Sequence, residues 1–349
     1  MSINTKKPFF VAEISANHCG SLKIAKQLVD DAKKYGADAV KLQTYTPDSM
    51  TLNSGKKNFL VSEGIWKGKK LWDIYDLAQT PLEWHKELFK YCKKKKIICF
   101  STPFDERAVD FLEDLNCPFY KVSSFEMTDL SLIKKIAKTK KTIIMSTGMA
   151  NLNEIEISYN TAKKYGAKKI TLLYCVSNYP SKLFDFNLKN INILKNKFKC
   201  RVGLSDHSTD NIIAKLAIAS GADIIEKHIA IHSRKDSLDY NFSIKGKEIK
   251  KFREDIDLAY KLIGKDEFHR TKDELKNRKF RRSVYVTKKI KKGDKFSVDN
   301  IKKIRPGYGV NPVYYDLILG KRAYRNFDEG TAFTKQFLKK LKIKKTYLL

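Results

Sequence analysis

RVGLSDH at residues 201–207 and ADIIEKH at residues 222–228 are two short apolar segments that each end in polar residues. Six earlier segments have the same character, and their polar ends are Glu13, Lys41, Ser101, Lys121, Ser146 and Ser177. Val- and Ile-rich strands that alternate with helices indicate a parallel α/β sheet, and eight repeats favour a closed (β/α)8 TIM barrel. Because a barrel gathers the C-terminal ends of all its strands around one pocket, we expect these residues to share a site. An open doubly wound sheet is the alternative, but no GxGxxG turn follows the first strand.

The chain is longer than one barrel requires. A barrel of roughly 250 residues leaves about a hundred of the 349 for another domain. We therefore predict a barrel over residues 1–264, closed by a helix near 248–263. Residues 265–282 are almost wholly polar, which predicts an exposed linker. Short strands and turns predict a small second domain over residues 283–349.

Hydrophobic periodicity predicts helices near residues 22–35, 81–95, 105–114 and 151–165. Residues 44–80 form an unusually long insertion that contains Trp66, Trp72 and Tyr75. Because long loops in compact domains are usually functional, we expect this insertion to serve the site.

Composition limits the class of protein. No apolar run approaches the roughly 18 residues of a membrane span, and the apolar N-terminal stretch is too short for a signal peptide. Six scattered cysteines without CxxC spacing indicate reduced, mostly buried thiols in the cytoplasm. The net charge of +31 suggests a protein that binds nucleic acid. Against this, only 11 of the 70 basic residues are Arg, and the lysines are spread over helix faces. Solvated lysines are the simpler interpretation, and they would attract anions to the site.

Two histidines are candidate metal ligands. His207 and His228 follow the seventh and eighth strands, and adjacent strands lie about 5 Å apart, so both imidazoles can reach one ion. Two protein ligands leave coordination positions for water and substrate. Hydrogen-bonding pocket histidines are the alternative. His18 follows the first strand and is expected to line the pocket or to lie in a loop, while His232 is expected beyond the strand end. His85 and His269 are expected to be solvated.

Charged and hydroxyl side chains at the other strand ends are suited to an anionic substrate. Lys41 and Lys121 lie in apolar strands, where an ammonium group requires a partner, and a bound anion would supply one. Lys121 is also a candidate Schiff-base lysine, as in barrel aldolases. Glu13 lies in a strand that normally excludes carboxylates, which indicates a catalytic or metal-linked role or else a salt bridge to a lysine. Several serines are candidates for contacts to phosphate oxygens: Ser101, Ser124, Ser146 and Ser205.

These residues stand in motifs that together resemble the sialic acid synthase family. The motifs are VAEISANH, GADAVKLQTY, STPFD, YKVSSFE, STGMA, GLSDHS, EKHI and the C-terminal IRPGYGV. The resemblance covers almost the whole chain. It implies condensation of phosphoenolpyruvate with an acetamido sugar, a divalent metal in the barrel, and a C-terminal antifreeze-like (SAF) domain. It also implies a domain-swapped homodimer, in which this domain reaches the partner subunit's barrel.

Site roles follow from the resemblance residue by residue. It implies that His207 and His228 bind the metal, with Mn²⁺ favoured over Mg²⁺ or Co²⁺, and that Glu13 is the catalytic acid or base. Tyr179, Asp239 and Arg305 are the implied contacts to the sugar, with Arg305 reaching it from the other subunit. The implied phosphoenolpyruvate contacts are Lys41, Lys121, Ser124, Ser146, Ser177 and Ser205.

The segment at residues 66–89 resembles the pseudaminic acid synthase branch, whose sugar is 2,4-diacetamido-2,4,6-trideoxy-L-altrose. Residues 231–243 depart from the family pattern, so N-acetylneuraminate and legionaminate synthases remain alternatives. Two other classes also remain open: a Schiff-base lysine aldolase and a protein that binds polyanions without catalysis. We expect neither nucleic acid nor a membrane as a partner.

Overall fold

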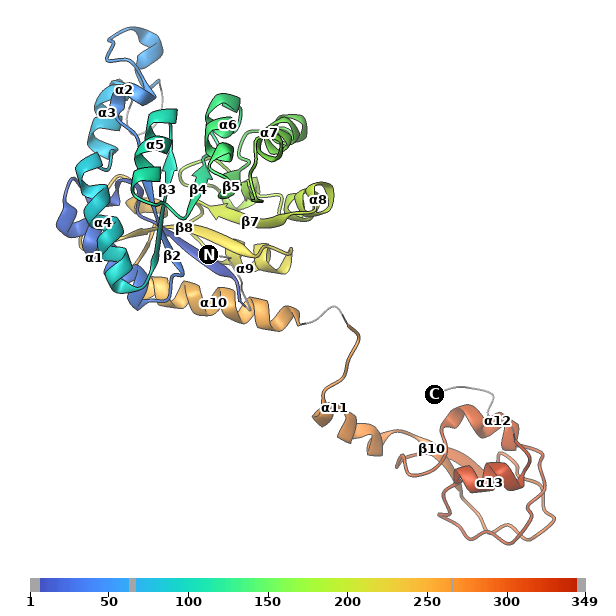
Figure 1. Ribbon diagram of the computed structural model, residues 1–349. Helices are drawn as coiled ribbons and strands as arrows, with labels where there is room; N and C mark the ends of the chain where they lie inside the picture. The colour runs from blue at the N-terminus through green and yellow to red at the C-terminus, as the bar shows by residue number, and fades with distance from the viewer. Residues whose placement is uncertain (1–6, 63–66, 265–266, 344–349) are drawn as a thin grey trace. The chain divides into compact units, whose positions relative to one another are not determined.

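The computed structural model describes residues 7–62, 67–264 and 267–343 (Figure 1). Trp66 of the predicted insertion therefore lies outside the described residues. The chain divides into two compact units, Met1–Gly264 and Lys265–Leu349. Each unit has its own hydrophobic core.

The first unit is a closed parallel barrel, as predicted. Neighbouring strands pair in chain order, and β1 also pairs with β8, which closes the sheet. The strands are β1 (Phe9–Glu13), β2 (Ala39–Thr44), β3 (Ile98–Pro103), β4 (Phe119–Val122), β5 (Thr142–Ser146), β6 (Lys169–Cys175), β7 (Arg201–Asp206) and β8 (Ile224–Ala230). A ninth strand, β9 (Ile244–Lys245), which the sequence did not predict, pairs with the end of β8.

Helices surround the strands (Figure 1). They are α1 (Leu22–Lys34), α4 (Leu82–Lys95), α5 (Glu106–Asp114), α6 (Leu130–Lys138), α7 (Leu152–Lys164), α8 (Lys189–Phe198), α9 (Ile212–Ala219) and α10 (Lys247–Ile263). The predicted helices agree with these bounds to within a residue or two. In α1, Ser21 caps the N-terminus by accepting a hydrogen bond from the backbone N–H of Ile24. Its buried residues recur at helical spacing and face the sheet: Ile24, Ala25, Leu28, Val29 and Ala32.

Two short helices occupy the insertion between β2 and β3. They are α2 (Pro47–Met50) and α3 (Leu71–Ala78), with a 3₁₀ turn at Lys57–Phe59 between them. Tyr45, immediately after β2, packs edge-on against Tyr75 of α3 and against Phe104. These contacts anchor the insertion beside the C-terminal end of β2.

The second unit is small. Its elements are α11 (Lys272–Lys276), β10 (Ser283–Val286), β11 (Ile301–Ile304), α12 (Tyr315–Ile318) and α13 (Lys335–Lys340). β10 and β11 are antiparallel, and Phe296, Phe327 and Phe333 pack together in the core. The segment predicted as a linker contains α11 and a 3₁₀ turn at Asn277–Phe280, yet residues 267–282 are all exposed.

Two expectations from composition concern the whole chain. All six cysteines are free thiols, and Cys92, Cys99, Cys117 and Cys175 are buried. Over the part of the chain that the structure describes, each helix is too short or too polar to cross a bilayer.

Candidate active site

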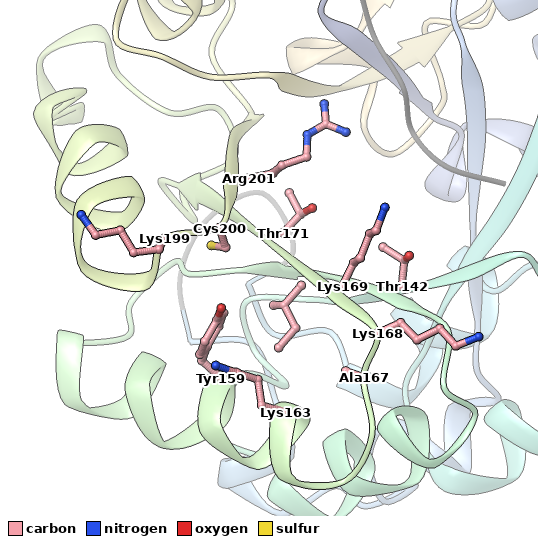
Figure 2. A pocket seen from close by; sticks show the side chains of 11 residues that line it. Thr142, Tyr159, Lys163, Ala167, Lys168, Lys169, Thr171, Lys199, Cys200 and Arg201 are labelled. Carbon is pink, nitrogen blue, oxygen red and sulfur yellow. The ribbon is translucent and has the colours of Figure 1, made fainter.

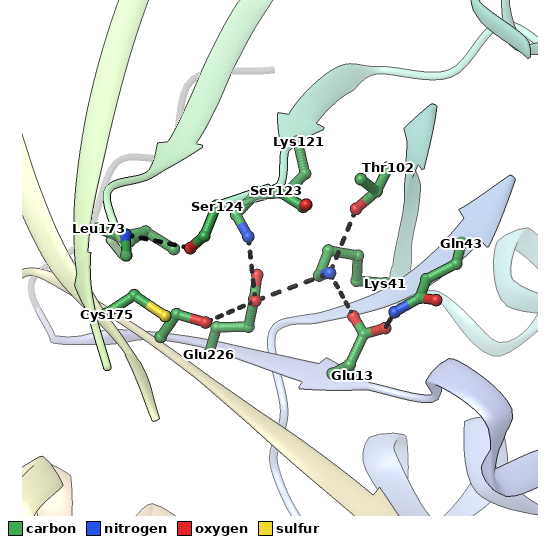
Figure 3. Close-up of polar contacts among 12 residues, drawn as sticks. Glu13, Lys41, Gln43, Thr102, Lys121, Ser123, Ser124, Leu173, Cys175 and Glu226 are labelled. Atoms are coloured by element: carbon green, nitrogen blue, oxygen red, sulfur yellow. Dashed lines mark hydrogen bonds and ion pairs between the residues drawn. The ribbon is translucent and has the colours of Figure 1, made fainter. Parts of the chain in front are cut away.

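Two lysines and two glutamates meet inside the C-terminal end of the barrel (Figure 3). Lys41 Nζ lies 2.7 Å from Glu13 Oε2 and 3.6 Å from Glu226 Oε1. Lys121 Nζ lies 3.2 Å from the same Glu226 oxygen. All four side chains are almost fully buried. The cluster therefore pairs two ammonium groups with two carboxylates at the base of the predicted pocket.

Hydroxyl and amide groups complete this cluster. Lys41 donates to Thr102 Oγ1 at 3.2 Å, and Gln43 Nε2 donates to Glu13 Oε1 at 3.3 Å. Ser205 Oγ donates to Glu226 Oε1 at 3.0 Å. The second oxygens, Glu13 Oε2 and Glu226 Oε2, lack a hydrogen-bond donor within the described ranges, although Glu13 Oε2 has its ion pair with Lys41. The carboxylates therefore retain capacity to accept further hydrogen bonds.

Burial and ion pairing shift the pKa values of the four side chains in different directions. Burial raises the pKa of Glu13 above its usual value, although Lys41 opposes the shift. Burial also lowers the pKa of Lys121, despite the charge of Glu226. For Lys41, burial is outweighed by Glu13 and Glu226, which raise its pKa. For Glu226, Lys121 and Lys41 outweigh burial and lower the pKa to about 2. Glu226 is thus a carboxylate, and Glu13 is the group suited to exchanging a proton.

Glu226 is the site residue that the sequence analysis missed. It precedes His228 by two positions in β8, and alternate residues of a strand face the same side. That spacing placed Glu226 on the lumen side together with His228. Lys41 therefore does not depend on a bound anion for charge compensation, because the chain itself supplies Glu13 and Glu226.

His207 and His228 face each other at the same end of the barrel. Their ring centroids are 5.4 Å apart. His207 Nδ1 lies 3.1 Å from the carbonyl oxygen of Val176, and His228 Nδ1 lies 3.3 Å from Asp239 Oδ2. Phe242 packs edge-on against both imidazoles. The predicted sugar contacts Tyr179 and Asp239 are here too, since the Tyr179 ring lies 4.3 Å from His207.

This donor set fits a divalent metal with open positions. Nδ1 of His207 is bonded to the Val176 carbonyl oxygen and Nδ1 of His228 lies near Asp239, so the Nε2 lone pairs of both rings are candidate ligands. Burial alone would raise the pKa of Asp239, but the nearby His228 lowers it, so Asp239 is a carboxylate that faces His228 Nδ1. Within residues 7–62, 67–264 and 267–343, no three His, Cys, Asp or Glu side chains form a metal-binding group.

Two of the predicted phosphate-binding serines, Ser124 and Ser177, lie beside Gly148, after β5. Its backbone N–H donates to Ser124 Oγ at 3.1 Å. A Cβ atom at this glycine would lie 2.1 Å from Ser177 Oγ and 2.8 Å from Ser124 Oγ, so a side chain would fill the space between them. Ser146 is buried, and its hydroxyl has no partner in the described chain. These groups form a small cradle of hydroxyls suited to an anion.

Other candidates differ in their environment. His18 lines this end of the barrel: its ring packs edge-on against Trp84, and burial lowers its pKa to about 4. The expectation that His85 is solvated is wrong, because the α4 face that carries it packs on the barrel. His85 is fully buried, with Nε2 2.8 Å from Thr44 Oγ1. Ser101 bonds the same Thr44 at 2.6 Å rather than lining the cradle. Arg305 is exposed, and it lies in the second unit, after β11.

A cavity of about 310 Å³ lies at the opposite end of the barrel (Figure 2). Thr142, Lys169 and Arg201, which line it, begin β5, β6 and β7. Its lysines do not converge, because Lys168 and Lys199 point in different directions (Figure 2). The cavity is therefore separate from the residues described above.

Comparisons with known proteins place the chain in a family. Residues 28–268 match the model of the NeuB family, and residues 281–339 match the SAF domain. The pseudaminic acid synthase of Campylobacter jejuni is 42% identical over 94% of this chain and 95% of its own length. The N,N'-diacetyllegionaminic acid synthase of the same organism is 38% identical over 93% of this chain and 98% of its own. The crystal structure of N-acetylneuraminic acid synthetase from Leptospira borgpetersenii superposes with a TM-score of 0.71 at 28% identity, covering 79% of this chain and 94% of that one.

Proposed function

We propose a specific product for this chain, which belongs to the NeuB family of phosphoenolpyruvate-dependent nonulosonic acid synthases. The proposed product is pseudaminic acid. The proposed reaction condenses phosphoenolpyruvate with 2,4-diacetamido-2,4,6-trideoxy-L-altrose and releases phosphate. The single observation that carries the reaction is the buried cluster of Lys41, Lys121, Glu13 and Glu226 beside the His207–His228 pair.

The proposed sugar rests on similarity and on the insertion. Identity to a pseudaminic acid synthase is 42%, against 38% to a diacetyllegionaminic acid synthase. The insertion places Tyr75 against Tyr45 beside the mouth, where it could contact the sugar. Legionaminate and N-acetylneuraminate synthesis are the alternatives within the family.

The anionic substrate is proposed to bind where the cations and hydroxyls meet. Lys41 and Lys121 would contact the phosphate and carboxylate, and the Gly148 cradle of Ser124 and Ser177 would hold phosphate oxygens. Because both lysines are paired with carboxylates, a bound anion has to compete with Glu13 and Glu226. The ion pairs with Glu13 and Glu226 hold the two lysine side chains in place before substrate arrives.

His207 and His228 would hold a divalent metal, for which Mn²⁺ is favoured over Mg²⁺ and Co²⁺. When bound, the metal supplies Lewis-acid polarisation of the sugar aldehyde. The Val176 carbonyl oxygen would hold the ring of His207, and the Asp239 carboxylate faces Nδ1 of His228 at 3.3 Å.

Glu13 is proposed to handle the proton of the reacting water. In the net reaction C3 of phosphoenolpyruvate bonds to C1 of the aldehyde, water adds at C2, and phosphate leaves with cleavage of its C–O bond. The attacking water must lose a proton, and a buried carboxylate with a raised pKa can accept and return it. Gln43, which donates to Glu13, would orient the carboxylate for this transfer.

A sugar-by-sugar assay tests this function. The purified protein is incubated with phosphoenolpyruvate, Mn²⁺ and one candidate sugar, and phosphate release is followed with and without EDTA. We expect release with the L-altrose sugar, no release with EDTA, and loss of activity in His207→Ala. His232→Ala is the matched control, because His232 is exposed and lies beyond the end of β8.

Each other outcome has a definite meaning. Release with N-acetylmannosamine or with the legionaminate precursor instead would move the protein to a sister branch. Phosphate release that does not depend on metal would contradict the proposed metal-binding role of His207 and His228. A Schiff-base aldolase is a different class from the synthase that the family shows, so we expect borohydride to trap no adduct on Lys121.

Arg305 is proposed to act across a domain-swapped dimer. In that arrangement the SAF unit of one subunit supplies Arg305 to the sugar in the partner subunit's barrel. Mixed oligomers of His207→Ala and Arg305→Ala chains test it, since one barrel would then contain every required group. Recovery of activity on mixing two inactive variants is expected. Absence of recovery, in oligomers shown to exchange subunits, would contradict the swapped arrangement.

A further inference from the structure

An ion pair on the outer side of the barrel wall connects β7 to β8. Lys227 Nζ lies 2.9 Å from Asp206 Oδ2. The two side chains are 1% and 0% exposed, so this is the most deeply buried of the ion pairs in the described chain. The catalytic cluster does not use it, and nothing in the reaction proposed above requires it.

The position of the pair follows from strand alternation. Ser205 and His207 face the lumen from β7 and the turn after it, and Glu226 and His228 face it from β8. Asp206 and Lys227, which lie between these residues, point to the other side of the sheet. They are direct partners in the register of the two strands. The ion pair thus joins β7 and β8 on the outer side of the wall, directly behind the residues that form the histidine pair.

The ion pair also binds the backbone of Ser208, the residue after His207. The Ser208 N–H donates to Asp206 Oδ1 at 2.8 Å, and Lys227 Nζ donates to the Ser208 carbonyl oxygen. The carbonyl oxygen of His207 itself accepts a hydrogen bond from the Ser181 N–H at 3.0 Å. Polar groups of both peptide units after the His207 Cα are therefore bound. Asp206 at the end of β7 binds the Ser208 N–H, and Lys227 of β8 binds the Ser208 carbonyl oxygen.

We propose that Asp206 and Lys227 are positioning residues, which set His207 at the separation from His228 that a shared metal ion requires. The inference rests on the proposed metal role of the two histidines. Neither side chain touches the substrate or the metal in this scheme. They act through the 206–208 turn, whose conformation fixes the imidazole of His207.

The alternative is that the pair serves stability alone. The double variant D206L/K227M separates the two roles. Removing one partner leaves an uncompensated buried charge, which is strongly destabilising, whereas replacing both by apolar side chains of similar volume is often neutral. The double variant should therefore fold, while its 206–208 turn has lost both side-chain contacts. Positioning predicts that metal binding weakens in a protein that is still stable.

The experiment measures Mn²⁺ binding to the full chain without substrates, by titration calorimetry. Thermal unfolding and the ¹H–¹⁵N spectrum of the histidine side chains are recorded on the same samples. The matched control is R253M, because Arg253 is also a buried cation, bonded to Asp38 and to the Pro8 carbonyl beside the start of β1. We expect D206L/K227M to bind Mn²⁺ about ten-fold to a hundred-fold more weakly, as for other groups that orient metal ligands. R253M should lose thermal stability and keep its Mn²⁺ affinity.

The possible results separate the two proposals. Wild-type Mn²⁺ affinity together with an unchanged His207 signal in the double variant would overturn positioning. If the wild type itself binds no Mn²⁺, the metal part of the proposed function fails, and the His207 signal still decides. A signal that shifts or broadens in D206L/K227M and not in R253M would then support positioning, and an unchanged signal would contradict it. If D206L/K227M does not fold, D206N/K227M with the same measurements replaces it, because it also leaves no uncompensated buried charge. A loss of Mn²⁺ affinity in D206N/K227M no larger than in R253M would overturn the inference.

Discussion

At the scale of single residues, Glu226 links the two lysines of the site. One oxygen lies within 3.2 Å of Lys121 and 3.6 Å of Lys41, and it also accepts from Ser205. A buried carboxylate is costly unless cations compensate it, and these two cations do. Glu226 is therefore both an electrostatic requirement of the site and a stabilising group whose contribution depends on pH.

Glu226→Gln should reveal that dependence. The folded-state pKa is lowered from 4.5 to about 2, so the stabilisation is fully present above 4.5 and is lost as the pH falls toward 2. We expect the difference in free energy of unfolding between wild type and Glu226→Gln to narrow by about 2 kcal/mol between pH 7 and pH 3. Urea unfolding at each pH measures it, with the exposed Glu83→Gln as control. A difference that does not change with pH would contradict the assignment of Glu226 as a compensated carboxylate.

Gly148→Ala should impair phosphoenolpyruvate binding. The new Cβ would lie 2.1 Å from Ser177 Oγ and 2.8 Å from Ser124 Oγ, so it would displace both hydroxyls and fill the cradle. We expect the KM for phosphoenolpyruvate to rise about ten-fold, roughly the loss of one good hydrogen bond to a charged group, with little change in the KM for the sugar. Gly55→Ala is the matched control, because nothing lies within 4 Å of its Cβ position. An equal change in the KM for phosphoenolpyruvate in both variants would contradict the proposed role of the cradle in phosphate binding.

At the scale of elements, the turns after the strands carry the chemistry, and the helices that follow hold those turns. The turn between β5 and α7 contains Gly148, and α7 begins directly after it with a capping box. Asn151 Oδ1 accepts from the backbone N–H groups of Asn153 and Glu154, and Glu154 Oε2 accepts from the Asn151 N–H. The start of α7 is thereby fixed by its own sequence.

Asn151→Ala should destabilise the protein by about 1 kcal/mol, because the first N–H groups of α7 lose their acceptor. Urea unfolding at pH 7 measures the change. Asn153→Ala serves as the control, since Asn153 contributes its backbone N–H to the cap. A cost for Asn153→Ala as large as that for Asn151→Ala would show that the cap is not the cause.

At the scale of the whole molecule, two units with separate cores are joined by an exposed basic segment. The barrel core and the core around Phe296 and Phe333 share no member. Residues 267–282 are exposed throughout and include Lys272, Lys276 and Arg278. Each unit therefore buries its own apolar side chains, and protease-sensitive bonds concentrate between them.

Limited trypsin digestion should cut first within residues 270–282. This segment is exposed throughout and contains only one short helix and a 3₁₀ turn, so it enters a protease site more readily than the packed elements of either unit. Mass spectrometry of the earliest products should give one fragment from each unit. Earliest cuts inside α4 or β8 would contradict the division into two units.

The sequence by itself determined the architecture. Strand and helix periodicity is local, so the eight strands, five of the barrel helices and the boundary near Gly264 could be predicted from residue patterns. Strand ends also placed His207, His228, Lys41 and Glu13 on one rim, because a barrel has a single C-terminal face. The family motifs supported the class of reaction in the same way.

Only the tertiary structure decided how these residues pair. Lys121 and Glu226 are 105 positions apart, and no local pattern states that one carboxylate serves two lysines. The burial of His85 and the bond from Lys227 to the Ser208 carbonyl likewise depend on which side chains meet after β1 pairs with β8. Periodicity fixes which face of a strand a residue occupies, whereas barrel closure fixes its neighbours, and charge compensation in a buried site depends on those neighbours.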